Sequence, residues 1–329
     1  MTDKKEGSAP IRTMIGGQAV LEGLMMMGPA KTALAVRQSN GNIQLEYMPT
    51  GKAASKAASI PFLRGSVRLF RQMVIGVKAL LRSADLLEEA EQKEIPDTEI
   101  SGAVSQEAAD EPKPGGSSNL AIYASAAVGI LLGIGLFMLL PNLITSLIKR
   151  LTSLGSEKGF GSTLLLNLIE GAIRITLFVV YVALTSIQKD IRRVWMYHGA
   201  EHKTIACYEK GLPLTVENIR TFSTRHPRCG TAFLFVVMIV SILLFTFAGW
   251  YSGIVNILIR FALVPLVAGI AFEIIRWSGR HDNALSRLVA MPGLAMQRLT
   301  TREPDDEMIE VAILAMEAVI PETPLQDEW

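Results

Sequence analysis

Residues 120–148, LAIYASAAVGILLGIGLFMLLPNLITSLI, decide the fold class of this chain. The stretch contains no charged side chain and is followed directly by Lys149 and Arg150. A helix needs about 20 mostly apolar residues to cross a hydrocarbon core of roughly 30 Å, so this stretch predicts a membrane-spanning helix. Residues 231–250 are equally free of charge and end in Trp250, which precedes Tyr251. Aromatic pairs of this kind are typical of the membrane interface, which predicts a second span.

Two further segments, residues 162–188 and 254–275, are apolar enough to span but carry charges at their centres. Glu170 and Arg174 are four residues apart in the first segment, so they share one face of a helix and can form an ion pair. We interpret this pair as a packing contact between helices, and a transport pathway is the alternative interpretation. The sequence therefore predicts a mainly α-helical, polytopic membrane protein with about four transmembrane helices.

The distribution of charge predicts how these helices are oriented. The chain has 329 residues, 32 Lys and Arg against 31 Asp and Glu, and a net charge of only +1, so a nucleic-acid binder is not expected. Basic residues are concentrated before the first span, in the loop 189–230 and in the tail 276–329. The positive-inside rule then places both termini and that loop in the cytoplasm of a multi-pass cell-membrane protein.

The region before the first span, residues 1–87, is predicted to be a small cytoplasmic α+β region. Its first residues, MTDKKEGSAPIRT, are polar and contain no apolar core of signal-peptide length. Residues 33–47, ALAVRQSNGNIQLEY, place apolar side chains on both sides of a tight turn signal, Asn40 and Gly41, a pattern typical of a β-hairpin. The preceding stretch IGGQAVLEGLMMMGP, residues 15–29, is rich in glycine and is interpreted as a buried, turn-rich segment. A glycine nest for an anion is the weaker alternative.

Residues 60–87 place apolar side chains at helical spacing with five basic residues among them. Such a helix can lie on the inner leaflet of the bilayer and bind anionic lipid, or it can dock on the protein's own core. Residues 88–119 are acidic and then rich in Pro, Gly and Ser, so they predict a flexible linker. In the C-terminal tail, acidic residues 305–307 predict the start of a helix over 308–320.

Three of the four histidines and both cysteines fall between residues 198 and 229. The stretch DIRRVWMYHGAEHKTIACYEKG, residues 190–211, is predicted to continue the helix of the second span. His198 and His202 are four residues apart, so both imidazoles can reach one ion at about 2.0 Å. The spacing is H-x-x-E-H, the inverted form of a zinc motif in which the glutamate acts as general base, a role we assign to Glu201.

A second pair of potential ligands, His226 and Cys229, lies just before the third span. Neutral imidazole and thiolate are the natural ligands of zinc, so His198, His202, His226 and Cys229 are the predicted ligands of a divalent metal, most simply zinc. Alternatively, His226 and Cys229 cap the start of the next helix. Cys207 lies off the histidine stripe. Other candidate contributors are carboxylates or a later imidazole: Glu209, Glu217 and His281.

Four blocks of the sequence resemble the YqhQ-like family of bacterial membrane proteins. They are GGQAVLEGLMMMGP, YHGAEHKTIACYEKG with LTVENIR, HPRCGTAFLF, and RHDNALSR through PGLAMQRLTTREPDD, and the resemblance extends from about residue 14 to about residue 318. The family has no established function and is sometimes described as a predicted metal-dependent enzyme. The resemblance thus implies a protein of the bacterial inner membrane. A basic residue usual in the family's first motif is replaced here by Met27.

Three hypotheses follow for the function. The first is an integral membrane protein with a cytoplasmic metal site of hydrolase type, in which Glu201 activates water. The second is a non-enzymatic membrane scaffold or regulatory protein with a structural metal site, which four protein ligands would favour. The third is a transporter that uses Glu170, Arg174, Arg260 and Glu273. The sequence names no protein partner.

Overall fold

The computed structural model describes residues 13–49, 60–94, 117–152, 154, 159–227, 229–251 and 253–321. The chain forms two compact units. The first contains Met1–Gln92, Tyr181–Ser241 and Ala262–Trp329, and the second contains Lys93–Val180 and Ile242–Phe261. The described part of the chain is mainly helical with a small antiparallel sheet near the N-terminus, as the sequence predicts.

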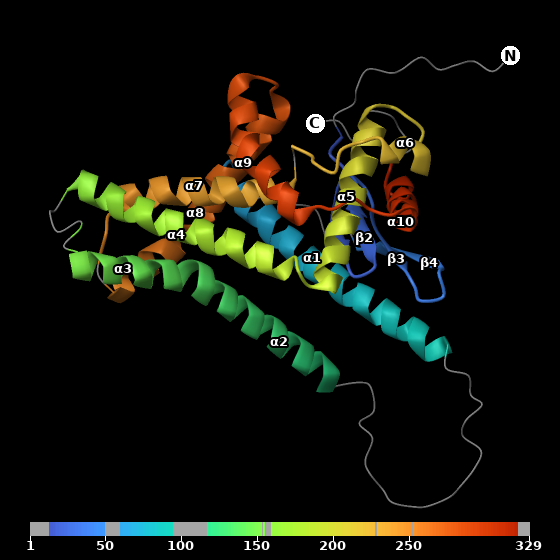
Figure 1. Ribbon diagram of the computed structural model, residues 1–329, viewed down its shortest axis with the longest axis horizontal. Coiled ribbons are helices and arrows are strands. Elements are labelled where there is room, and N and C mark those ends of the chain that lie inside the picture. The colour runs from blue at the N-terminus through green and yellow to red at the C-terminus, as the bar shows by residue number, and fades with distance from the viewer. Residues whose placement is uncertain are drawn as a thin grey trace, which may run out of the picture. The chain divides into compact units, whose positions relative to one another are not determined.

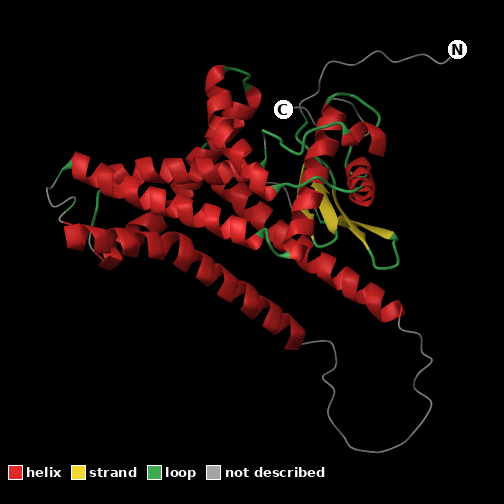
Figure 2. Ribbon diagram, viewed as in Figure 1, coloured by secondary structure: helices red, strands yellow, loops and turns green. Residues whose placement is uncertain are grey.

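The sheet of the first unit has four strands in the order β1-β2-β3-β4, all antiparallel (Figure 2). The predicted hairpin is formed by β3 (Thr32–Arg37) and β4 (Ile43–Met48), with Gly41 at a φ of 83° in the turn. The turn requires this left-handed conformation, which glycine adopts without steric cost. The stretch interpreted as turn-rich instead forms β1 (Gly16–Val20) and β2 (Gly23–Met27).

The sequence analysis did not predict β1 and β2, because they lack the alternation of polar and apolar side chains that marks a half-exposed sheet. Helices cover both faces of this sheet. Side chains of β2 and β3 alternate between two separate hydrophobic clusters. Leu24 and Met26 pack toward α5 (Lys189–Glu209) and α10 (Asp306–Glu317), whereas Met25 packs toward α1 (Leu63–Glu94). These three helices surround the strands of the sheet in Figure 1. A strand buried on both faces reads as a continuous apolar run, which periodicity alone does not identify.

The helix predicted within residues 60–87 is confirmed as α1. It continues to Glu94, into the segment 88–119 that was predicted to be a linker. The reason is local: residues 88–94, EEAEQKE, are strong helix formers. Residues 95–116 of the predicted linker lie outside the described residues.

The helix of the second candidate span does not continue into the histidine segment. Helix α4 (Phe160–Thr185) ends, a turn follows, and α5 begins after its N-cap residue Gln188, which has an extended backbone. The hydroxyl groups of Thr185 and Ser186 both donate to the carbonyl of Val182. Such side-chain bonds compete with the helix hydrogen bonds, which explains the break.

The remaining helices of the first unit include α6 (Val216–Arg220) and α9 (Ala284–Thr300). Helices α7 (Gly230–Ala248) and α8 (Gly253–Arg280) contribute residues to both units. The predicted C-terminal helix is α10, whose N-cap Asp305 accepts a hydrogen bond from the backbone N–H of Met308.

The second unit contains α2 (Ser117–Ile134), a π-helical turn η3 (Gly135–Leu139), α3 (Leu140–Thr152) and most of α4. Pro141 cannot donate to the carbonyl of Phe137, which instead accepts a hydrogen bond from Arg174 Nε at 3.0 Å. Arg174 Nη2 also lies 2.6 Å from Glu170 Oε1, so the predicted ion pair is present. The buried Arg260 binds the same carboxylate, and its guanidinium stacks on Trp250.

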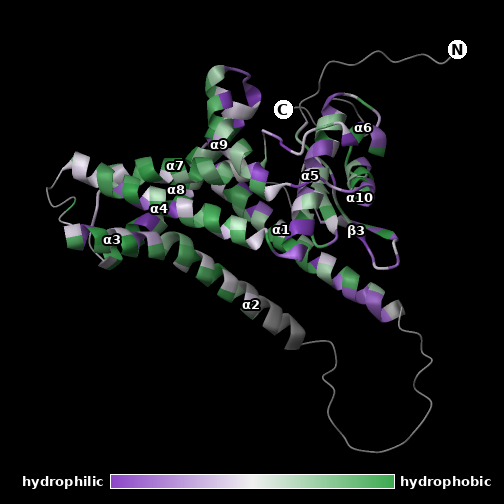
Figure 3. Cartoon of the chain, in the orientation of Figure 1, coloured by the Kyte–Doolittle hydropathy of each residue, from purple (hydrophilic) through white to green (hydrophobic). Residues whose placement is uncertain are grey.

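In the described part of the chain, three helical segments are long and apolar enough to cross a membrane (Figure 3). They are Ala127–Thr152, Phe160–Thr185 and Gly253–Arg280, and only 11%, 17% and 33% of their most apolar windows are buried. Apolar surface left exposed in this way is suited to lipid. Phe233–Ala248, within the predicted third span, is apolar but shorter.

Candidate metal centre

Helix α5 presents His198 and His202 side by side from a buried face. The ring centroids of the two histidines are 4.4 Å apart, as expected for residues one turn apart. The residues from Tyr197 to Ile205 are all buried, because this part of α5 is enclosed by the sheet, α6 and α10. Gly199, between the two histidines, allows the chain at Arg302 to pass close by: a Cβ at Gly199 would lie 2.0 Å from the Arg302 carbonyl oxygen.

Cys229 completes a compact group of three potential metal ligands. The Cys229 sulfur lies 3.2 Å from Nε2 of His198, and the ligand atoms of His198, His202 and Cys229 all lie within 4.8 Å of one another. Both cysteines of the chain are thiols rather than a disulfide. Such a group could hold a metal ion, because imidazole nitrogen and thiolate sulfur are the donors that zinc prefers.

Backbone carbonyls fix the tautomers of both histidines. Nδ1 of His198 lies 2.7 Å from the Thr300 carbonyl oxygen, and Nδ1 of His202 lies 2.6 Å from that of Thr224. A carbonyl oxygen only accepts, so each Nδ1 must carry the proton and donate it. In the neutral rings, Nε2 therefore carries a lone pair directed away from those carbonyls. Metal-bound histidines in proteins are commonly oriented by this kind of bond.

The Nε2 atom of His202 is buried and has no hydrogen-bond partner among the described residues. Burial lowers the pKa of His202, an effect that the nearby Cys229 opposes, so the neutral ring is favoured. A buried acceptor without a donor is costly. The residues present thus fit a cation at this position, which would occupy the lone pair that no described residue engages.

Glu201 points toward the sheet. Its Oε1 accepts a hydrogen bond of 2.9 Å from the backbone N–H of Gly17 in β1. A side chain at residue 17 would meet Glu201, since a Cβ there would lie 3.0 Å from the Glu201 carboxyl carbon. Burial raises the pKa of Glu201, while the nearby His198 imidazole and the Gly17 N–H act in the opposite direction. The carboxylate is therefore held beside His198 by an element that sequence reasoning did not connect to it.

The turn between β1 and β2 is fastened to α5 by Glu22. This residue has a φ of 47°, a conformation that is uncommon outside glycine, and its carboxylate binds the guanidinium of Arg193 through both oxygens. The hydroxyl of Tyr197 is 3.4 Å from the same carboxylate. Burial raises the pKa of Tyr197, which keeps this hydroxyl protonated at neutral pH. Glu22 thus joins the first hairpin to the helix of the histidines.

His226 lies next to the three-residue group rather than within it. Its ring centroid is 5.7 Å from that of His202, and its Nε2 lies 3.5 Å from Oε2 of Glu209. The other oxygen of Glu209 accepts the backbone N–H of Thr13 at 3.0 Å. The backbone of His226 exchanges two hydrogen bonds of 2.8 Å with the side-chain amide of Gln297. His226 is thereby held rigidly beside the site.

The other residues considered from the sequence lie elsewhere. Cys207 is buried with Ile219 and Ile309, and burial raises its pKa, so it is a packing residue. Glu217 is exposed on α6. His281 is exposed after α8 and stacks on Trp277 with ring centroids 5.0 Å apart.

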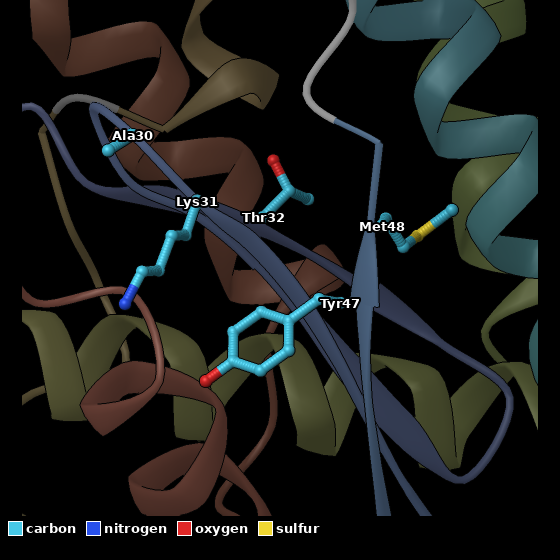
Figure 4. A pocket seen from close by; sticks show the side chains of 5 residues that line it. All are labelled: Ala30, Lys31, Thr32, Tyr47 and Met48. Atoms are coloured by element: carbon cyan, nitrogen blue, oxygen red, sulfur yellow. The ribbon is translucent and has the colours of Figure 1, made fainter.

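A separate hollow of about 360 Å³ lies at one end of the β3–β4 hairpin (Figure 4). It is lined by Ala30, Lys31, Thr32, Tyr47 and Met48, and it contains none of the histidine or cysteine ligand candidates. Its lining has a single ionisable amine and a phenol but no carboxylate or imidazole, so it has no ligand set comparable to that on α5.

The fold and the site define a mainly helical protein with candidate membrane spans, a small sheet and a buried His/His/Cys group. The profile of the family described as "Protein of unknown function (DUF1385)" matches residues 60–322, and the chain belongs to this family. It is 33% identical over 307 residues to the uncharacterized protein YqhQ of Bacillus subtilis (strain 168), covering 91% of this chain and 89% of that protein. The resemblance to YqhQ-like proteins is therefore confirmed. No solved structure matches the chain.

Proposed function

We propose that this protein is an integral membrane protein with a cytoplasmic zinc site of hydrolase type. His198, His202 and Cys229 would hold the ion, and Glu201 would act as general base. Bound there, zinc would supply a Lewis acid that lowers the pKa of a water molecule. The buried Glu201 side chain, held by the Gly17 N–H, would be the residue of this chain that takes up a proton as general base.

The observation that carries the proposal is the shared orientation of the two imidazoles. Each donates its Nδ1–H to a backbone carbonyl, and Nε2 of His198 is in contact with the Cys229 sulfur. A hydrogen-bonded core histidine would need only one of these contacts. Two rings with fixed tautomers that converge on one thiol are instead characteristic of a preorganised metal site.

Three protein ligands would leave a fourth tetrahedral position for water or substrate, as in catalytic zinc sites. The competing possibility is the structural site of a scaffold or regulatory protein, in which His226 supplies a fourth ligand and closes the coordination shell. The contact of His226 with Glu209 favours the open site, because that carboxylate already engages its Nε2.

Metal analysis of the full-length protein tests the site. The wild-type chain, purified in detergent without chelator, is expected to contain about one zinc ion per chain. His202→Ala is expected to lose it, whereas His281→Ala is the matched control on an exposed histidine. A metal-free wild-type protein that also fails to bind added zinc would overturn both the catalytic and the structural versions.

Cobalt substitution separates the two versions without knowledge of the substrate. An open site is expected to bind added azide with a change in the visible cobalt spectrum, and the spectrum should also change with pH near neutrality. Glu201→Gln should keep the cobalt but shift the pH of that change. A closed four-ligand site would respond neither to azide nor to pH, and His226→Ala would then be the variant that opens it.

The proposed topology places both termini and the loop 189–230 in the cytoplasm. It is supported by the concentration of basic residues in those segments. It requires an even number of spans, so the shorter apolar helix Phe233–Ala248 would have to cross the membrane together with the three candidate spans. A C-terminal fusion to a fluorescent protein that matures only in the cytoplasm should be bright, and a fusion to a phosphatase active only outside it should be inactive. The reverse pattern would refute this orientation.

A further inference from the structure

The guanidinium of Arg260 is buried inside the second unit, within the candidate span α8. Its Nη1 donates to the Glu170 carboxylate, and its Nη2 donates to Asn167 Oδ1 at 3.2 Å. Its central carbon lies over two aromatic rings, 5.1 Å from the ring centroid of Phe245 and 5.0 Å from that of Trp250. Since the N–H groups of a guanidinium lie in its plane, further ligands must approach at its edge.

Two N–H donors on α8 are buried and have no hydrogen-bond partner among the described residues. They are Nε of Arg260 and Nδ2 of Asn256, and both residues are only 2% exposed. Residues four apart share one face of a helix, so the two donors belong to the same side of α8. A buried donor left unpaired is costly. Both groups can only donate, so a partner for them must be a hydrogen-bond acceptor.

The charge around these donors is unbalanced. Oε1 of Glu170 is shared by Arg260 and by Arg174, whose Nη2 lies 2.6 Å from it. The other oxygen of Glu170 accepts a hydrogen bond of 3.4 Å from the neutral Asn142. These three charged side chains therefore carry one positive charge in excess. Excess charge is costly in a low-dielectric interior, and ionisable side chains within membrane spans are normally paired.

We propose that a halide ion, most simply chloride, binds at Nε of Arg260 and Nδ2 of Asn256. A halide accepts hydrogen bonds from both donors and supplies the one negative charge that balances the cluster. A metal cation does not suit the position, because the guanidinium repels it and the two nitrogens offer no lone pair. Sulfate and phosphate carry more charge and more acceptor atoms than two donors can satisfy. The proposal goes beyond the zinc site and does not depend on it.

Thermal unfolding of the full-length protein in detergent tests the proposal. Sodium chloride or sodium bromide replaces sodium gluconate at constant ionic strength, so that only the anion changes. A ligand that binds the folded state stabilises it, so both halides should raise the unfolding temperature in a saturable manner. Equal unfolding temperatures in halide and in gluconate would overturn the proposal.

Trp250 provides a spectroscopic readout, because its ring lies against the guanidinium of Arg260. A bromide ion bound at this guanidinium should quench the fluorescence of Trp250 in a saturable manner, and chloride should reverse the quenching by competition. Trp250→Phe should lose the saturable quenching but keep the thermal shift, since a phenyl ring can also cover the guanidinium. Saturable quenching that persists in this variant would place the ion elsewhere and contradict the assignment.

Asn256→Asp puts a fixed carboxylate in place of the ion. It should weaken halide affinity by at least about 100-fold, because like charges about 4 Å apart repel strongly inside a protein. In gluconate this variant should unfold no lower than the wild-type protein, because the carboxylate balances the excess charge. The matched control is Asn40→Asp in an exposed turn, where the side-chain oxygen accepts the backbone N–H of Asn42 and a carboxylate can do the same. Its halide response should equal that of the wild-type protein.

Arg260→Gln is the complementary variant, which removes the excess charge and the Nε donor together. It should also lose the halide response. The proposal would be refuted if either Asn256→Asp or Arg260→Gln kept the wild-type halide response, or if Asn40→Asp lost it to the same extent. Zinc content, measured on the same samples, reports separately on the proposed hydrolase site.

Discussion

The imidazole Nε2 of His198 lies 3.2 Å from the sulfur of Cys229, although 31 positions separate the two residues in the sequence. The contact joins helix α5 to the segment immediately before α7. It brings a soft donor to a pair of imidazoles whose protons are already engaged by carbonyl oxygens. Because of this contact, the two histidines of α5 and Cys229 form one group of three potential metal ligands.

Replacing each cysteine in turn should distinguish the role of Cys229 from that of Cys207. Cys229→Ser is expected to lower zinc affinity by at least about 100-fold, more than the roughly 10- to 100-fold typical of losing an outer-shell partner. Cobalt-substituted protein should also lose the sulfur-to-metal charge-transfer band in its near-ultraviolet spectrum. Cys207→Ser should keep zinc but lose about 1–3 kcal/mol of stability, because a hydroxyl replaces a buried packing thiol. Equal metal loss in both variants would contradict the assignment of Cys229.

Gly17 should be essential for the position of Glu201, and its neighbour provides a matched control. A Cβ at Gly17 would lie 2.7 Å from the Met25 carbonyl oxygen, whereas a Cβ at Gly16 would meet nothing within 4 Å. Gly17→Ala is therefore expected to cost about 1–3 kcal/mol and to displace Glu201, while Gly16→Ala should have little effect. Thermal unfolding and the pH dependence of the cobalt spectrum measure the two consequences. Indistinguishable variants would show that β1 does not position the carboxylate.

The ion pair between β4 and α1 should make stability depend on pH. Both oxygens of Glu46 bind Arg82, at 2.8 and 2.9 Å, and this holds the pKa of Glu46 below its usual value of 4.5. A lowered carboxyl pKa stabilises the fold above pH 4.5, and the contribution disappears as the pH falls through the lowered value. Glu46→Gln should thus cost about 0.2–1 kcal/mol at neutral pH and nothing in strong acid. A stability difference that is independent of pH would refute this account.

The stability of the protein should depend more on some members of the charged cluster in the second unit than on others. Glu170 contacts both Arg174 and the fully buried Arg260. Glu170→Gln leaves two buried guanidinium groups without a carboxylate and is expected to cost about 3–5 kcal/mol, whereas Arg260→Gln leaves a balanced pair and should cost less. Thermal unfolding of the two variants in the same detergent measures the order. The reverse order would weaken the interpretation of Glu170 as the packing counter-ion.

The sequence predicts the members of the site better than their roles. His198, His202 and Cys229 follow from ligand chemistry and from the helical spacing of the histidines, and they do come together. The carbonyls that fix the rings belong to Thr224, in the loop after α6, and to Thr300, the last residue of α9. Backbone acceptors cannot be recognised from residue type. The same limitation applies to Gly17, whose N–H holds Glu201. Glu209 was a candidate ligand, and its contact with His226 becomes visible only in three dimensions.

Apolar runs and turn residues were sufficient to predict those elements of the fold in which a single structural rule applied. Asn40 and Gly41 identified the β3–β4 hairpin, and the absence of charge over 120–148 identified an apolar helix. The strands of residues 16–27 were missed because a sheet covered on both faces has no alternating pattern. The break after Thr185 was missed because side-chain hydroxyl bonds to the backbone outweighed the helical periodicity.

The reliance of His198 on the Thr300 carbonyl has a consequence for biosynthesis. During translation the two histidines and Cys229 emerge long before residue 300, yet the ring of His198 acquires its fixed orientation only when that late segment has folded back. Glu201, by contrast, depends on Gly17, which is made among the first residues. An ion that arrives early at the proposed zinc site would therefore meet all three ligands before the His198 ring is oriented, so the preorganised geometry would be complete only when nearly the whole chain has left the ribosome.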